Sequence, residues 1–133
     1  MSGFSAYASK RGLWAMSHPD PPPPIALDDF LKVDIRVGTI IAAQPLEGAR
    51  IPALVLTIDF GSAIGIKQSS ARITRNYQPA DLVGRQAAAV VNLPARRVGR
   101  VLSQVLTLGF PDAAGEVVLV APERGVPNGG RLY

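Results

Sequence analysis

One run of alternating residues does most to limit what this chain can fold into. Every second position from residue 54 to residue 60 holds a large apolar side chain: Leu54, Leu56, Ile58 and Phe60. Successive side chains of a β-strand point to opposite faces, so this period of two predicts a strand with a buried face. Gly61 and Ser62 then give a turn signal, and the apolar pattern resumes at Ile64 and Ile66. The segment therefore predicts a β-hairpin.

Further strands are expected on both sides of this hairpin. Val33, Ile35 and Val37 alternate with charged residues, and Gly38 allows a bend or bulge before the strand continues at 40–41. Later apolar segments predict strands at 86–93, 101–108 and 116–120, and short helical turns fit 27–31 and 78–82. Five main strands with little helix predict an all-β fold, a small barrel with a short N-terminal helix and a C-terminal extension.

The first 25 residues differ in composition from the rest. The stretch 1–14 is rich in Ser, Gly and Ala without a hydrophobic period, and 21–24 is an unbroken proline run. Proline cannot enter a helix or a sheet interior. We interpret 1–25 as a disordered leader or the product of a mis-assigned start, with Met16 as a plausible initiator, and 26–133 as the folded domain.

Composition removes several functional classes. The chain has no cysteine, and its single histidine, His18, lies in the leader. Disulfides, cysteine-based metal sites and histidine-dependent hydrolytic triads are therefore not expected. No apolar stretch approaches the roughly 18 residues that would cross a bilayer. We expect a soluble, cytoplasmic binding protein with no metal, no cofactor and no catalytic residues.

Positive charge is concentrated in the middle of the chain. Between Lys67 and Arg100 there are seven cations and one acid, whereas residues 27–66 hold three cations and five acids. A basic region on a near-neutral frame is typical of a face that binds a polyanion. The alternative is that these arginines simply solvate the surface.

The segment 87–91, Ala-Ala-Ala-Val-Val, is apolar at every position. An antiparallel strand with one face in water should alternate instead. Either a helix or the C-terminal segment covers its outer face, or that face forms an interface between two protomers.

Several segments in order resemble the tRNA-binding domain family. Residues 30–38, F-L-K-V-D-I-R-V-G, resemble its opening signature, and 92–103, N-L-P-A-R-R-V-G-R-V-L-S, its asparagine, basic loop and serine. The segments V-L-T-I-D-F-G and I-G-I-K-Q-S-S-A within 54–71, with V-P-N-G at 126–129, resemble the CsaA-type branch of secretion-associated chaperones. The resemblance extends over 27–133.

The resemblance implies an oligonucleotide/oligosaccharide-binding (OB) barrel, a homodimer and no catalysis. It also implies two ligand classes, unfolded or presecretory polypeptides and tRNA. Where the wider family has S-G-I, this chain has Q-S-S-A at 68–71, and where it has S-x-G-M, this chain has S-Q-V-L at 103–106. Both differences follow the CsaA-type branch, so polypeptide is the first candidate ligand and tRNA the second.

Candidate ligand contacts are the polar and basic side chains of the middle region. Guanidiniums bind phosphates or carboxylates through charge-assisted hydrogen bonds, and amides and hydroxyls add further partners. For Asn92 and Ser103 we favour a structural tie over direct ligand contact, because polar groups in apolar strands need partners. For Asn92 we expect the tie to be to the following loop. The candidates are Lys67, Gln68, Ser69, Ser70, Arg72, Arg75, Asn92, Arg96, Arg97, Arg100 and Ser103.

Overall fold

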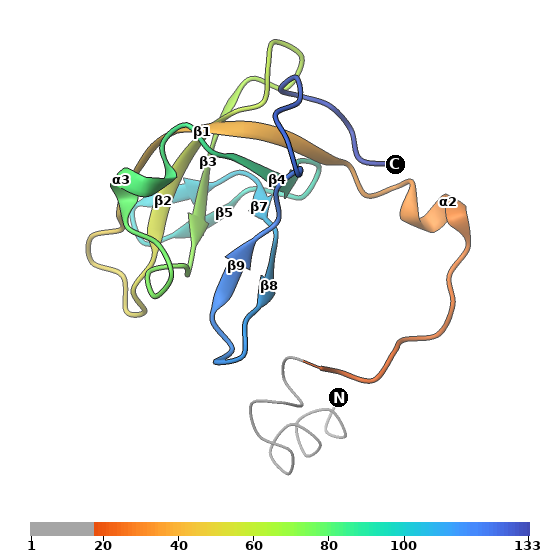
Figure 1. The fold of residues 1–133 in the computed structure, drawn as a ribbon, viewed down its shortest axis with the longest axis horizontal. Helices are drawn as coiled ribbons and strands as arrows, with labels where there is room; N and C mark the ends of the chain where they lie inside the picture. Colours follow the sequence, from red (N-terminus) through yellow and green to blue (C-terminus); the bar gives the residue numbers. More distant parts are fainter. Residues whose placement is uncertain (1–17) are drawn as a thin grey trace.

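The computed structural model describes residues 18–133, and its central feature is a five-stranded antiparallel sheet (Figure 1). The strands lie in the order β3-β2-β1-β4-β7. Their bounds are β1 Ile35–Pro45, β2 Leu54–Asp59, β3 Ile66–Ala71, β4 Gln86–Val90 and β7 Leu106–Thr107. The predicted hairpin is present, although its second strand begins at Ile66 and not at Ile64.

The sheet curls until its two edges nearly meet, which makes it the expected OB-type barrel. The amide of Gln104 donates to the carbonyl of Gln68 at 2.8 Å, and the amide of Gln68 donates to the Gln104 side chain at 2.9 Å. Inside the barrel, the hydroxyl of Thr107 donates to the hydroxyl of Ser69 at 2.7 Å. These bonds join β3 to the segment leading into β7 and satisfy groups that an open sheet edge would leave exposed.

Strand β1 is long because it pairs with β4 along its first half and with β2 along its second. The irregularity in its pairing with β2 falls between Ile40 and Ala42, so the bulge predicted at Gly38 lies further along the strand. Gly38 has another function: a Cβ there would meet Ile58 Cγ2 at 2.6 Å and Phe60 Cδ1 at 2.8 Å. Its missing side chain lets β1 approach β2 closely.

The barrel is filled by the alternating residues that the sequence singled out. Leu54, Leu56, Ile58 and Phe60 are all buried in one cluster. Helix α3, Pro79–Leu82, contributes fully buried Leu82 to the same core. Burial of side chains of this size supplies about 1.5–3 kcal/mol each.

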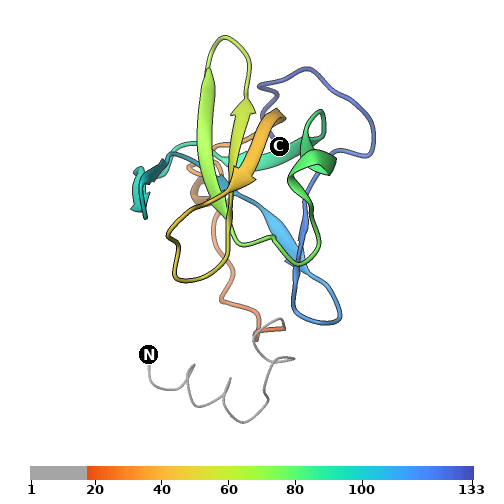
Figure 2. The same cartoon turned by 90° about the vertical axis from the view of Figure 1, so that its left-hand side faces the viewer.

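Two hairpins extend from the barrel. β5 (Arg96–Val98) pairs with β6 (Val101–Ser103), and β8 (Gly109–Pro111) pairs with β9 (Val117–Leu119). Figure 1 shows the β8–β9 hairpin projecting from the barrel, and Figure 2 shows the β5–β6 hairpin as the teal ribbon at its side. The single strand predicted over 101–108 was therefore wrong. It is divided into β6 and β7, which belong to different sheets.

The C-terminal residues 121–133, here called the strap, run back along β1. The amide of Gly129 donates to Val37 O at 2.8 Å, and the amide of Leu132 donates to Ile35 O at 2.9 Å. The side-chain amide of Gln86 holds the backbone of Val126 through both its oxygen and its nitrogen. The predicted C-terminal extension is thus part of the fold.

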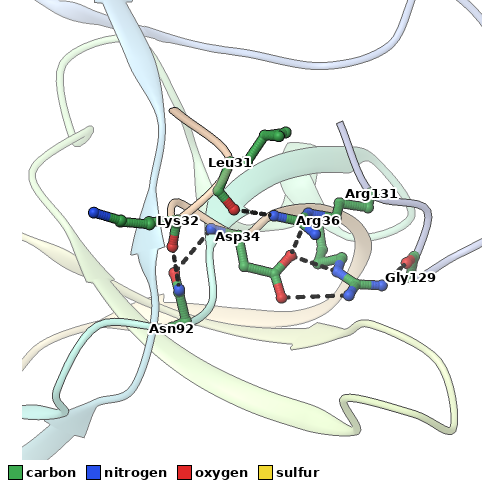
Figure 3. Close-up of polar contacts among 7 residues, drawn as sticks. All are labelled: Leu31, Lys32, Asp34, Arg36, Asn92, Gly129 and Arg131. Atoms are coloured by element: carbon green, nitrogen blue, oxygen red, sulfur yellow. Dashed lines mark hydrogen bonds and ion pairs between the residues drawn. The ribbon is translucent and has the colours of Figure 1, made fainter. Parts of the chain in front are cut away.

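A polar cluster fastens the strap at the start of β1 (Figure 3). The Asp34 carboxylate accepts a hydrogen bond from Arg36 at 2.6 Å and lies 3.5 Å from the Arg131 guanidinium. The bond to Asp34 raises the pKa of the Arg36 guanidinium above its ordinary value. Arg131 also donates to the carbonyl of Leu31, just after helix α2 (Leu27–Phe30), at 2.6 Å. The cluster thereby joins the N-terminal helix to the strap.

Both faces of β4 are covered, which explains its apolar sequence. Ala87 and Ala89 point into the core, while Ala88 and Val90 are buried on the outer side. The amide of Ala88 donates to Val120 O at 2.9 Å, directly before the strap. Of the two interpretations of this segment, coverage by the C-terminal residues is the one observed within the chain.

Most of the predicted leader, residues 1–17, lies outside the described residues. Residues 18–25 are exposed and carry no regular secondary structure. No helix within 18–133 has the length and apolar character needed to cross a bilayer.

Candidate binding groove

A hollow of about 750 Å³ opens beside the β5–β6 hairpin, and we call it the basic groove. The 46–53 loop between β1 and β2 forms one wall, and the end of β3 and the hairpin form the others. Its lining residues are Gly48, Ala49, Arg50, Ile51, Ala53, Ser70, Arg72, Arg96, Val98 and Gly99.

A small apolar cluster outside the barrel holds these walls in place. Val55 points away from the main core and packs with Leu46 and Ala53, both buried. Val98 and Val101 of the hairpin pack against the same cluster. Because β2 alternates, Val55 fixes the loop and the hairpin on one face while its neighbours fill the barrel on the other. Side-chain packing thus positions the guanidiniums.

A second hollow of about 350 Å³ adjoins the first, and we call it the apolar pocket. The two share the lining residues Ser70 and Arg96, so they lie side by side, and together they are called the joined site. Ser103 at its floor is buried, and its hydroxyl accepts a hydrogen bond from the Ser70 amide at 3.0 Å. Its lining residues are Ser70, Leu93, Pro94, Arg96, Ser103, Gln104, Val105 and Leu106.

The joined site is strongly positive. Its described lining residues include Arg50, Arg72 and Arg96 and no carboxylate. Within residues 18–133, these three guanidiniums form no ion pair and donate no hydrogen bond to the protein. Each retains five N–H donors for an incoming anion.

The structure brings Ser70, Arg72, Arg96 and Ser103 together at this site. Arg100 lines a separate hollow of about 360 Å³ that also contains Glu47. Arg97, next to Arg96 on β5, lines neither the basic groove nor the apolar pocket, as strand alternation requires. Arg96 and Arg97 lie in a short strand, so the prediction that they belong to a loop between strands was wrong.

Other candidate residues have their polar groups engaged within the fold. Ser69 is fully buried and donates to Val105 O at 3.2 Å. Asn92 accepts from the Asp34 amide at 2.9 Å and donates to Lys32 O at 2.7 Å (Figure 3). Asn92 is therefore a structural tie, as favoured, but to the start of β1 and not to the following loop.

Three remaining candidates do not line the joined site. Lys67 sits opposite Ile58 in the β2–β3 pair, and Gln68 contributes its backbone to the barrel closure. Arg75 is exposed in the segment after β3. None of the three lines the basic groove or the apolar pocket.

Sequence reasoning missed Arg50 and Ile51. They precede the region of concentrated positive charge, in a segment without a strand pattern. One signal was available: in OB barrels the loop between the first two strands and the loop between the last two form the two sides of the ligand site. Among the described residues, no cluster of His, Cys, Asp and Glu could hold a metal ion.

Two solved structures combine this fold with high sequence identity. The chaperone CsaA from Bacillus anthracis is 47% identical, with a TM-score of 0.78, over 84% of this chain and 100% of that chain. A CsaA chaperone protein from Picrophilus torridus is 41% identical, with a TM-score of 0.76, over 83% of this chain and 100% of that chain.

Sequence comparison also finds part of a much longer enzyme. The methionine–tRNA ligase of Chlorobium chlorochromatii is 36% identical over 107 residues, which are 80% of this chain and 15% of the ligase. This chain thus spans about 15% of that relative's length. Residues 35–131 match the family described as "Putative tRNA binding domain". The chain belongs to this tRNA-binding domain family, and it is of the CsaA type.

Proposed function

We propose that this protein is a chaperone-like binding protein that holds unfolded polypeptide segments in the basic groove and the apolar pocket, without catalysis. The observation that carries the proposal is that a hollow with three guanidiniums and a hollow with aliphatic lining lie side by side and share Ser70 and Arg96. A peptide in this site could bury aliphatic side chains while its carboxylates or carbonyls accept hydrogen bonds from guanidiniums. The likeness to CsaA chaperones over the whole of their chains supports this choice.

The test is suppression of aggregation. A chemically denatured client is diluted into buffer with increasing amounts of the full chain, without ATP, and light scattering is followed. We expect scattering to fall as the protein approaches equimolar amounts, and Arg96→Gln to weaken the effect more than Arg97→Gln. Undiminished scattering with several unrelated clients would reject the proposal.

A second candidate function is tRNA binding, favoured by the family match and by three guanidiniums at one site that have no partner within residues 18–133. Phosphate contacts release counterions, so affinity should fall steeply with salt. Filter binding of total tRNA between about 50 and 200 mM salt tests this function, because affinity that rests on several phosphate contacts falls by orders of magnitude over that range. If the affinity for tRNA does not change with salt, or is unchanged in the double variant Arg72→Gln and Arg96→Gln, the groove is not the tRNA site.

We further propose that the protein acts as a homodimer in the cytoplasm and that its clients include presecretory chains. Leu132 and Tyr133 at the end of the strap are exposed, beside an apolar hollow of about 530 Å³ over β1 and β4. A second copy covering this hollow would remove its apolar lining from water. Light scattering should give twice the chain mass, and Leu132→Asp should shift the mass toward the monomer. A monomer at all concentrations would refute the dimer.

A further inference from the structure

We propose that the joined site selects extended peptide segments in which a carboxylate lies beside aliphatic side chains, and that it disfavours segments carrying lysine or arginine. This inference rests on the proposed polypeptide-binding function and names its substrate class. It gives a binding role to Arg50, which the sequence did not single out, together with Arg72 and Arg96, which it did.

The positive half of the site is assembled from three separate parts of the chain. Arg50 comes from the 46–53 loop, Arg72 follows β3, and Arg96 lies on β5. Like charges brought together in one hollow repel one another, and here no carboxylate among the lining residues offsets them. An anion supplied by the ligand would relieve this repulsion and gain charge-assisted hydrogen bonds.

The other half of the site is aliphatic. In the apolar pocket, Leu93 and Leu106 remain 48% and 49% exposed, and in the basic groove Ile51 remains 50% exposed. Covering such side chains yields about 25 cal/mol for each Å² of apolar surface removed from water. A small inorganic anion would leave these aliphatic side chains exposed to water, whereas an acidic peptide with neighbouring aliphatic residues would cover them.

The composition of the site also separates peptide from nucleic acid. Among the residues that the structure describes, no Phe, Tyr or Trp lines either hollow. Proteins that hold single-stranded nucleic acid stack bases on aromatic side chains, with about 1–3 kcal/mol for each base. A polynucleotide would use the guanidiniums and find no stacking platform, so a peptide makes fuller use of the site.

Three fluorescein-labelled peptides of one length and one set of aliphatic residues test the inference. They differ only in carrying Asp, Asn or Lys at the same two positions, and fluorescence anisotropy measures their binding to the full chain. The carboxylate accepts charge-assisted hydrogen bonds that an ammonium group cannot accept, so the Asp peptide should bind about tenfold or more tightly than the Lys peptide. Arg96→Gln should narrow this ratio, with Arg72→Gln as a second variant, while Arg97→Gln should preserve it.

Each other outcome has a defined meaning. If the Lys peptide binds as well as the Asp peptide while aggregation is still suppressed, the inference is overturned and the proposed function stands. If no peptide binds and tRNA binding alone depends on Arg96, the inference is overturned and the site is the tRNA site of the second candidate function. If no peptide binds and aggregation is not suppressed, the proposed function itself has failed.

Discussion

The backbone amide of Ser70 donates a hydrogen bond to the hydroxyl of Ser103, 33 residues later, at 3.0 Å. This contact joins β3 to β6, and both residues also line the apolar pocket. The closing seam of the barrel is therefore also the floor of the proposed binding site. Changes to the seam should affect stability, whereas changes to the surrounding guanidiniums should affect binding alone.

Ser103→Ala removes the acceptor for the Ser70 amide. Ser70 is half-buried, and a typical intramolecular hydrogen bond contributes about 0.5–1.5 kcal/mol, so we expect a loss of that order in the free energy of unfolding. Urea denaturation measures it, with Ser62→Ala in the exposed β2–β3 turn as the control. Equal stability of the two variants would show that the seam contributes little.

Gly38→Ala should also destabilise the fold. The new methyl group would lie 2.6 Å from Ile58 Cγ2, so β1 and β2 must move apart. Overpacking of this kind typically costs about 1–3 kcal/mol. Gly125→Ala is the matched control, because nothing lies within 4 Å of a Cβ at that position. If both variants melt at the wild-type temperature, the close approach of β1 and β2 is not required.

Asp34→Asn should loosen the strap without unfolding the barrel. The carboxylate accepts from Arg36 and lies near Arg131, and its charge holds both guanidiniums in place. Hydrogen exchange at the amides of Gly129 and Leu132, which bond to β1, should become severalfold faster, while exchange in β2 stays unchanged. Asp28→Asn, on the exposed helix α2, should leave the strap as it is. Unchanged exchange at these two amides in Asp34→Asn would mean that backbone bonds alone retain the strap.

The turn of the β8–β9 hairpin should weaken in acid. The Asp112 carboxylate accepts hydrogen bonds from Asn76 and from the amides of Glu116 and Ala114, and these bonds lower the pKa of Asp112 below its ordinary value. A lowered folded-state pKa means that the stabilisation is present above the unfolded-state pKa and is lost as pH falls through the folded-state pKa. The wild type should therefore be more stable than Asp112→Asn near pH 7, and the difference should shrink below about pH 4.

Urea denaturation of the wild type and of Asp112→Asn is measured at a series of pH values. The difference between their free energies of unfolding isolates the effect of Asp112 from that of the other carboxyls. If that difference in the free energy of unfolding stays constant down to pH 2, about two units below the ordinary carboxyl pKa, the ionised Asp112 carboxylate does not stabilise the turn.

Much of the barrel could be predicted from the sequence, because its signals are local. The alternation through Leu56 and Ile58 depends only on which face of one strand is buried, and the glycines after β2 end the strand where expected. What could not be predicted depends on distant partners. The break of 101–108 into two strands occurs because Ser103 and Val105 turn inward to bond with β3, and no local pattern encodes that partner.

The site was predictable in composition but only partly in geometry. The arginines of the middle region were visible, yet their separation onto different faces depends on the β5–β6 hairpin, which the sequence presents as a loop. Arg50 was missed because loop residues carry no periodicity. Its place in the groove arises from the packing of Leu46 and Ala53 against Val55.

The central claim is that the basic groove and the apolar pocket form the ligand-binding face. Titration of ¹⁵N-labelled full chain with the acidic aliphatic peptide, followed by amide chemical shifts, tests it most directly. We expect the shift changes to concentrate in residues 46–53, 68–72 and 93–106, and the amides of the β8–β9 hairpin to keep their shifts. If the shift changes are confined to the strap and the β8–β9 hairpin, and the amides of the groove residues keep their shifts, the groove and the pocket are not the ligand-binding face.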